Sequence, residues 1–165
     1  MNQGVHTVDL LLWLLGEVVS LRARTAMLLH RIETEDTALA LLEFANGAVG
    51  LLEATTAAYP GYPRRVELTG TEGTIVLEHD RIVVADLKGS PQDIVSSGPG
   101  DQNPSASSPL VTDFSGHQSA IEDFIRAIHE DGTPACDGRQ GRRSVALIES
   151  IYHAACTAEL SMRVS

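Results

Sequence analysis

Hydrophobic residues cover nearly every side of the first predicted helix, which begins near Gly4 and ends at Gly16. A glycine directly after the last helical residue is a common way for a helix to end. A helix that is apolar on almost every side is typical of a buried position. Its apolar residues are Val8, Leu10, Leu11, Leu12, Leu14 and Leu15.

The same helix carries a polar stripe. Asn2, His6 and Asp9 are four and three residues apart, so they lie on one side of the helix, and Trp13 continues the line. A histidine beside a carboxylate can hold or take a proton near neutral pH, which suits general acid–base catalysis. The alternatives are structural: Asn2 as an N-cap, Asp9 as an acid favoured by the helix dipole, and His6 as a core histidine.

Strand patterns follow the helix. Residues 17–29 alternate between apolar and polar side chains, which predicts a half-buried strand. Residues 36–45 and 48–57 flank Asn46-Gly47, the sequence typical of a hairpin with a type I′ turn. Both faces of this hairpin are largely apolar, so we expect a homo-oligomer in which a second copy covers the outer face. The chain's own loops or a missing domain are the alternative covers.

The rest of the chain predicts further strands at 64–68, 74–77 and 82–87, with a short one near 94–95. Residues 96–113 are rich in Ser, Pro, Gly and Asn and are expected to form a long, mobile loop. Two helices follow, beginning near Ser115 and Asp137. Their predicted buried stripes are Ala120, Ile121, Phe124, Ile125 and Ile128, then Val145, Ile148, Ile151, Tyr152 and Ala155. This order predicts an α+β fold, an open, mostly antiparallel sheet with helices on one face.

Three further residues are candidates for binding substrate. Tyr59 and Tyr62 lie in the proline-bracketed segment 59–63, where their rings could stack on a sugar, or could simply anchor the loop. His117, near a helix start, is either a pocket residue or a buried N-terminal histidine.

Composition narrows the classes of partner. The 165 residues suit one domain, and the net charge of −10 argues against nucleic acid or an anionic membrane as partner. No stretch reaches the length of about 20 apolar residues that a membrane span needs. Cys136 and Cys156 are far apart and indicate reduced thiols in the cytoplasm, with a single disulfide as the alternative.

Several common site motifs are missing from the sequence. It contains no Gly-rich dinucleotide or nucleotide fingerprint and no Gly-x-Ser-x-Gly element, so neither a cofactor site nor a hydrolase triad is expected in this chain. His153 and Cys156 are three residues apart on a helix, but no second ligand pair accompanies them, and we expect no metal site.

The order of several short segments resembles the C-terminal domain of the Gfo/Idh/MocA oxidoreductases, relatives of glucose–fructose oxidoreductase and inositol dehydrogenase. The resemblance covers nearly the whole chain, and its specificity lies in the order and spacing of the segments. They are residues 2–11 and 14–16, Glu35-Asp36-Thr37-Ala38, residues 44–48, Gly70-Thr71-Glu72-Gly73, His117-Gln118, Asp123-Phe124, residues 138–143 and Ile151-Tyr152.

The resemblance implies that residues 1–165 are a substrate-binding and oligomerisation domain. A Rossmann domain absent from this chain would bind NAD or NADP, and the substrate would be a sugar, a polyol or a related hydroxy compound. His6 matches the family's proton-transferring histidine, and Asp9 matches the acid that often follows it. Asn2 stands where many members have Asp; it can orient a substrate hydroxyl but cannot stabilise His6 as a cation.

Two hypotheses follow for the chain as a whole. It is either this domain of an NAD(P)-dependent dehydrogenase or a non-enzymatic binding or dimerisation module. Because Met1 stands directly against the polar start of the helix, we expect a fragment or a domain expressed alone. Alone, it is expected to be inactive and to bind neither NAD nor NADP.

Overall fold

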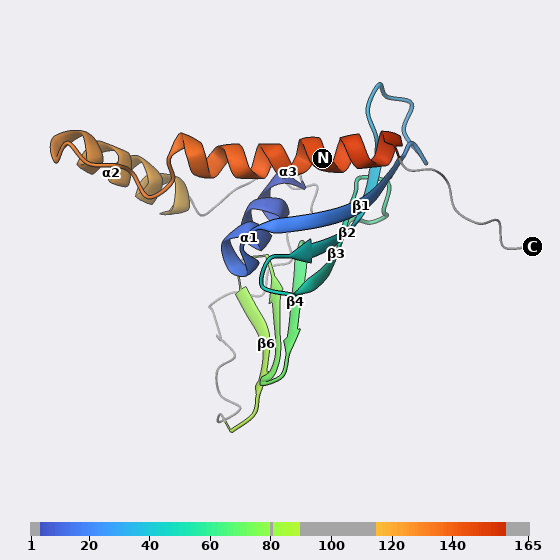
Figure 1. Cartoon of the computed structure of the whole chain (residues 1–165), viewed down its shortest axis with the longest axis horizontal. Coiled ribbons are helices and arrows are strands. Elements are labelled where there is room, and N and C mark those ends of the chain that lie inside the picture. Colours follow the sequence, from blue (N-terminus) through green and yellow to red (C-terminus); the bar gives the residue numbers. More distant parts are fainter. Residues whose placement is uncertain (1–3, 80, 90–114, 158–165) are drawn as a thin grey trace, which may run out of the picture. The chain divides into compact units, whose positions relative to one another are not determined.

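The computed structural model describes residues 4–79, 81–89 and 115–157. The chain forms two compact units, residues 1–57 with 111–165 and residues 58–110. The structure confirms the α+β class, with two antiparallel sheets of three strands each (Figure 1). In chain order the elements are α1 (Val5–Leu15), β1 (Val18–Ala26), β2 (Thr37–Phe44), β3 (Val49–Thr55), β4 (Arg65–Gly70), β5 (Gly73–Glu78), β6 (Arg81–Leu87), α2 (Ser115–His129) and α3 (Gly138–Thr157).

Helix α1 ends where the sequence predicts. Gly16 adopts a φ of 86°, which an L side chain rarely tolerates, and its N–H donates to the carbonyl of Leu12 at 3.1 Å. The expectation that the helix is buried on all sides is wrong for this chain. Only Val8 and Leu12 are buried, because the sheet and α3 cover one side of α1 and leave the other open.

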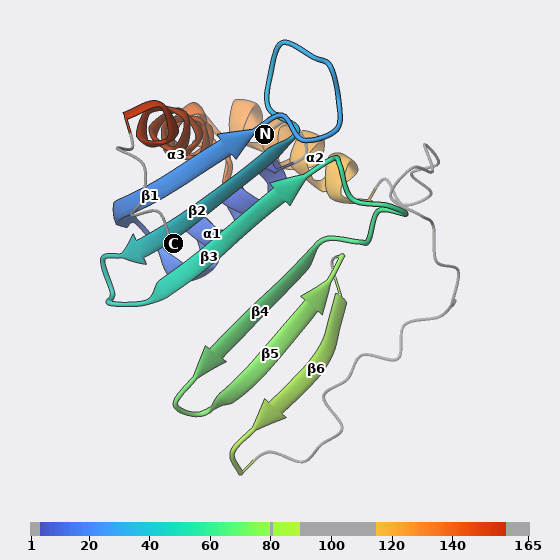
Figure 2. The same cartoon turned by 90° about the vertical axis from the view of Figure 1, so that its right-hand side faces the viewer.

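Strands β1, β2 and β3 form an antiparallel meander (Figure 2). The predicted hairpin is present, but its turn is not type I′. Only Gly47 has a positive φ (87°), whereas a type I′ turn needs two such residues. Gly47 N–H donates to the carbonyl of Phe44 and the Asn46 side chain accepts from Ala48 N–H, which describes a type I turn followed by a left-handed glycine.

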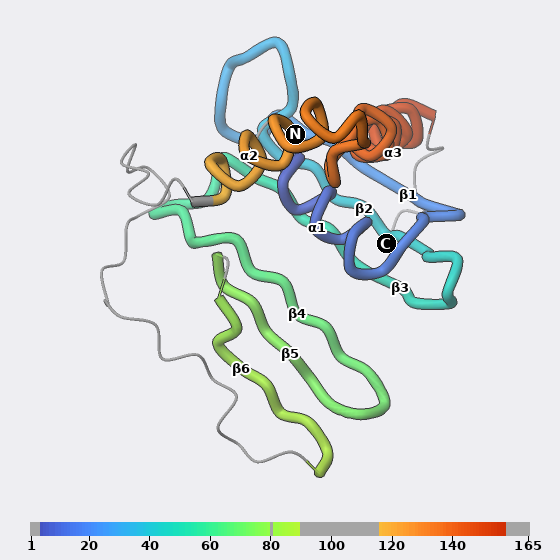
Figure 3. The backbone as a smooth tube through the Cα atoms, turned by 90° about the vertical axis from the view of Figure 1, so that its left-hand side faces the viewer, coloured from blue at the N-terminus to red at the C-terminus, as the bar shows by residue number. Residues whose placement is uncertain are grey.

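Strand β1 is shorter than its alternating pattern predicts. It ends at Ala26 because the carboxylate of Asp36 accepts the backbone N–H groups of Leu28, Leu29 and His30 at 2.7–3.0 Å. Those N–H groups are therefore directed toward one side chain and are not available to a neighbouring strand. The segment between β1 and β2 is the open loop that stands apart in the tube view (Figure 3).

The core of the first unit lies between the inner face of the β1–β3 sheet and the helices α1 and α3. The strictly alternating burial of β2 places four side chains on this face, Ala38, Ala40, Leu42 and Phe44. The last three of them pack with Leu52 of β3 and with residues of both helices in one cluster: Val8, Leu12, Ala40, Leu42, Phe44, Leu52, Leu147 and Ile151.

The predicted buried stripes of the last two helices need correction. In α2 the apolar residues Ile121, Phe124, Ile125 and Ile128 are all exposed, and Ala120 is exposed as well. In the described part of the chain only Ala127 of this helix is buried. In α3 the buried line is Ser144, Leu147 and Ile151, while Val145 is exposed. Asp137 caps α3 as predicted and accepts from the N–H groups of Arg139 and Gln140.

The second unit contains the meander β4–β5–β6, which matches the strands predicted at 64–68, 74–77 and 82–87. Among the described residues of this unit, Val66, Val76 and Ala85 are buried. The short strand predicted near 94–95 and the loop predicted over 96–113 lie outside the described residues.

Candidate functional site

The open side of α1 carries the residues that the sequence marks as chemical. His6 and Asp9 are exposed, and Trp13 is 80% exposed. We call these three residues the α1 stripe. Their spacing of three and four residues places them on one side of the helix, adjacent to the line of the buried Val8 and Leu12. The exposure of His6 rules out the alternative of a histidine enclosed in the core.

Asp9 is held by a contact from a distant part of the chain. Ser144 Oγ, in α3, donates a hydrogen bond of 2.6 Å to Asp9 Oδ1. Ser144 is itself 4% exposed, so its hydroxyl is fixed by the packing of α3 against the core. A short O–H···O⁻ bond of this kind is among the stronger hydrogen bonds. It fixes one carboxylate oxygen and leaves Oδ2 without a hydrogen-bond partner among the described residues.

His6 stands one helical turn before Asp9. No side chain within the described ranges donates to or accepts from its ring, so both nitrogens are available to a ligand. An imidazole of this kind can accept a proton from a hydroxyl or return it, and the neighbouring carboxylate can accept a hydrogen bond from a second hydroxyl or stabilise the protonated ring.

A second polar link connects α3 to the loop that precedes β2. The hydroxyl of Tyr152 donates to Glu35 Oε1 at 2.8 Å. Burial raises the pKa of Tyr152 to about 12, and the hydrogen bond to Glu35 acts in the same direction. Tyr152 therefore stays protonated at neutral pH and acts as a donor that fixes the loop.

The remaining sequence candidates are Asn2, Tyr59, Tyr62 and His117. Asn2 lies outside the described residues. Tyr59 and Tyr62 belong to the second unit and are 96% and 78% exposed, so neither ring anchors its loop by packing. His117, in the first turn of α2, is exposed, which excludes the alternative of a buried N-terminal histidine.

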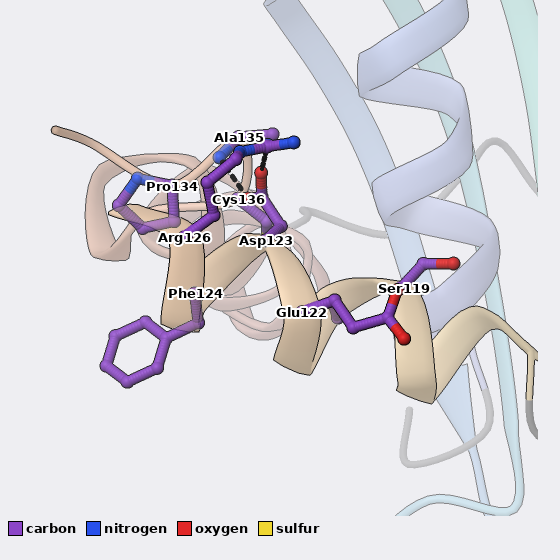
Figure 4. Close-up of a pocket in the computed structure, with 9 residues that line it drawn as sticks. Ser119, Glu122, Asp123, Phe124, Arg126, Pro134, Ala135 and Cys136 are labelled. Carbon is purple, nitrogen blue, oxygen red and sulfur yellow. Dashed lines mark hydrogen bonds and ion pairs between the residues drawn. The ribbon is translucent and has the colours of Figure 1, made fainter. Parts of the chain in front are cut away.

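A pocket of about 680 Å³ lies between α2 and the segment that leads to α3. Asp123 pairs there with Arg126, and its Oδ2 accepts the N–H of Ala135 at 2.7 Å (Figure 4). These contacts tie the connecting segment to α2. None of the residues predicted for the site lines this pocket, so we assign it no chemistry.

Two residue patterns bear on whether this chain binds a cofactor or a metal. Its sequence lacks a glycine-rich phosphate loop, and the described residues contain no cluster of three His, Cys, Asp or Glu. Cys136 and Cys156 are free thiols. Across the described ranges, no helix is both long and apolar enough to cross a bilayer.

Ser144 is the member of the site that the sequence analysis missed. The available signal was a small polar residue on the line that continues to Leu147 and Ile151, three and seven residues on. A hydroxyl at such a position needs a partner inside the fold. The stripe predicted for α3 started one residue later, at Val145, and so passed over it.

Comparison with known proteins agrees with this architecture. The model of the GFO/IDH/MocA C-terminal domain matches residues 1–76, which include α1 and the first sheet. The crystal structure of the WlbA dehydrogenase from Bordetella pertussis, in complex with NADH and UDP-GlcNAcA, superposes with a TM-score of 0.75 at 34% identity and covers 95% of this chain. The chain belongs to the GFO/IDH/MocA family.

The chain is also similar in sequence to two dehydrogenases of sugars and polyols. D-apiose dehydrogenase of Rhizobium rhizogenes is 28% identical over 92% of the chain. Inositol 2-dehydrogenase of Rhizobium meliloti is 26% identical over 90%. The chain spans 45% and 44% of these two relatives and 43% of the WlbA chain, so it corresponds to less than half of each protein.

Proposed function

We propose that the chain is the substrate-binding and oligomerisation domain of an NAD(P)-dependent dehydrogenase that acts on a sugar, a polyol or a related hydroxy compound. The observation that carries this proposal is the α1 stripe, an exposed His6 one turn from an Asp9 that Ser144 holds in place. Family membership adds that relatives with these activities share the fold. The coverage of less than half of each relative supports a cofactor domain outside these 165 residues.

In the proposed reaction, this chain binds the substrate and transfers the proton of its reacting hydroxyl. In a dehydrogenase of this kind a nicotinamide cofactor supplies the hydride chemistry. His6 accepts the proton of the reacting hydroxyl during oxidation and returns it during reduction. Asp9, fixed through Oδ1, offers its second oxygen to a substrate hydroxyl or to the protonated His6. Asn2, Tyr59, Tyr62 and His117 are proposed to contact other parts of the substrate.

The uncovered apolar side of the first sheet supports a homo-oligomer. Leu39, Leu41, Val49 and Leu51 are exposed on the face opposite the helices. A contiguous apolar surface of this kind is typical of a protein interface. We further propose a cytoplasmic location, because the two free thiols are typical of a reducing compartment.

A non-enzymatic binding or dimerisation module remains the second candidate, because the same exposed face and the short coverage of the relatives fit it equally well. The sequence encoded directly upstream of Met1 separates the two. A glycine-rich βαβ unit and a Glu-Lys-Pro segment in the same reading frame favour the enzyme. A stop codon followed by a separate ribosome site favours the module.

Substitution of His6 tests the catalytic assignment. In a two-domain form of the protein, His6→Ala should lower turnover by about 10²–10⁴-fold, the usual contribution of a general acid or base. Because His6 is exposed, the thermal midpoint should change little. Turnover within a factor of two of the parent would remove His6 from the mechanism.

Substitution of Ser144 tests the support of Asp9. Ser144→Ala removes the hydrogen bond that joins α3 to α1 and should cost about 1 kcal/mol of unfolding free energy in urea titrations. Ser150→Ala is the matched control, because Ser150 lies on the same helix, is exposed and donates only to the Ala146 carbonyl. Equal losses of unfolding free energy in the two variants would argue against a hydrogen bond from Ser144 that holds Asp9 in place.

A further inference from the structure

Helix α2 leaves its apolar side open. Ile121, Phe124, Ile125 and Ile128 are between 47% and 65% exposed, and their spacing of three and four residues places them on one side of the helix. We call these four residues the α2 stripe. In Figure 4 the ring of Phe124 points away from the helix. Large apolar side chains that gather on one side of a helix and stay exposed are typical of a surface that another body covers.

The chain's own polar contacts with α2 lie on a different side of the helix. Asp123 accepts the N–H of Ala135 at 2.7 Å and pairs with Arg126. Because successive helical residues are about 100° apart, Asp123 lies about 200° around the helix from Ile121. Among the described residues, the connection to α3 therefore holds α2 by its polar side and leaves the α2 stripe uncovered.

We propose that the α2 stripe is the surface on which the cofactor domain of the complete enzyme docks. The inference rests on the proposed function, which places a nicotinamide-binding domain outside these 165 residues. The chain spans 45% and 44% of two dehydrogenase relatives, so the larger part of each relative lies outside the matched region and includes enough chain for a covering domain. Docking would move the stripe from water into an interface between domains, which stabilises an amphipathic helix that its own domain leaves open.

The position of His117 supports this choice of partner. It lies four residues before Ile121, so it extends the α2 stripe by one helical turn, and it is exposed. A domain docked on the stripe would place His117 beside the boundary between two domains. Ligand sites occur preferentially at such boundaries. The same contact therefore gives His117 a route to the substrate in the proposed reaction.

A membrane surface fits the α2 stripe less well than a protein domain. Helices that lie on anionic membranes are rich in Lys and Arg on their polar face. The polar side of α2 carries Glu122 and Asp123, and its sequence has one Arg, Arg126, and no Lys. The net charge of −10 for the whole chain acts in the same direction.

Hydrogen exchange measured by mass spectrometry tests the docking. The exchange rates of residues 115–129 are compared between the 165-residue chain and the two-domain form of the protein. In the two-domain form the amides of α2 should exchange at least about tenfold more slowly, because a covered helix opens less often. The central strand β2 lies in the core of the first unit and should exchange alike in both forms, which establishes that this unit is equally folded in each.

Ile121→Lys and Ser119→Lys form a matched pair of variants. Both residues are exposed and both substitutions add the same charge to one turn of α2, but Ser119 lies about 200° around the helix from Ile121. In the two-domain form, Ile121→Lys should raise the exchange of α2 to the rate of the 165-residue chain, whereas Ser119→Lys should stay within about twofold of the parent. Neither substitution should change the exchange of the 165-residue chain by more than about twofold.

Three results would overturn the inference. Equal exchange of α2 in the two forms would mean that the cofactor domain does not cover it. Slow exchange already in the 165-residue chain would mean that the chain's own residues or a second copy cover the stripe, and a dependence on protein concentration separates these two. Equal effects of Ile121→Lys and Ser119→Lys in the two-domain form would exclude the stripe as the contact.

Failure of the proposed function gives a different result. An upstream reading frame that encodes no cofactor domain, or full turnover by His6→Ala, would count against the proposed function itself. An active two-domain enzyme whose α2 exchanges as fast as in the 165-residue chain would overturn the docking and leave the proposed function in place.

Discussion

At the scale of single residues, Asp36 shows how one side chain shapes a loop. It is 3% exposed, accepts backbone N–H groups from Leu28, Leu29 and His30, and also accepts the hydroxyl of Thr37. These donors hold the pKa of Asp36 well below its usual range, with the N–H of Leu28 contributing most. A carboxylate at this position therefore links the end of β1 to the start of β2 without any turn motif visible in the sequence.

The stability contributed by Asp36 should depend on pH in one direction. Its folded-state pKa is lower than the unfolded value of about 4, so the contribution is complete above that value and is lost as pH falls below it. Asp36→Asn replaces a carboxylate oxygen with an amide NH₂ group, which cannot accept hydrogen bonds from the surrounding backbone N–H groups. The substitution should therefore lower the unfolding free energy at pH 7. In urea titrations the difference from the parent should shrink as the pH is lowered through 4.

The control for this prediction is Asp86→Asn. Asp86 is exposed on β6 and its side chain has no hydrogen bond to a described residue, so its substitution should change stability little at any pH. A difference between Asp36→Asn and the parent that stays constant down to acid pH would contradict the proposed role of the carboxylate.

At the scale of elements, the helices differ in how much of their apolar stripe the chain itself covers. α3 buries Leu147 and Ile151 against the sheet and α1, whereas α2 leaves its isoleucines and Phe124 exposed. Both helices are amphipathic in sequence, and periodicity alone gives them the same interpretation. The difference arises because a stripe predicts a preference for contact and does not say whether the contacting surface belongs to the same chain.

Two isoleucines provide a matched comparison of these helices. Ile151 in α3 is 0% exposed and Ile121 in α2 is 60% exposed. Ile151→Ala should cost about 2–5 kcal/mol of unfolding free energy because it leaves a cavity in the core, and Ile121→Ala should cost about 0.5 kcal/mol or less. Denaturant titrations of both variants measure the contrast. Comparable losses would mean that α2 is packed in solution.

At the scale of the whole molecule, the chain consists of two compact units and spans less than half of its curated relatives. The candidate site residues His6 and Asp9 lie on an exposed side of α1, and the sequence contains no glycine-rich phosphate loop. The proposed dehydrogenase site, divided between two domains, would account for both features, because one domain would orient the substrate and the other would hold the cofactor.

The division of labour predicts that the isolated chain does not bind the cofactor. Titration of NAD, NADH, NADP or NADPH into the 165-residue chain in a calorimeter should give no binding signal at micromolar concentrations. A two-domain form should bind one of the four under the same conditions. Micromolar binding by the isolated chain would contradict the division and would require a cofactor site that its sequence does not display.

The sequence by itself determined the features that depend on neighbouring residues. These include the end of α1 at Gly16, the strand pairs around Asn46-Gly47, the cap at Asp137 and the stripe of His6 and Asp9. Each follows from backbone geometry or from a spacing of a few residues. The family resemblance rests on the same local segments, and the comparisons confirm it.

Only the tertiary structure decided which surfaces are covered and which distant groups meet. Ser144 and Asp9 are 135 positions apart, and nothing in either segment specifies the other as its partner. The choice of Ser144 over Val145 for the inner line of α3, the exposure of α2 and the type of hairpin turn were likewise settled by the packing of whole elements. The physical reason is that burial and side-chain pairing depend on the fold's full set of contacts, whereas periodicity records only the preference of each segment.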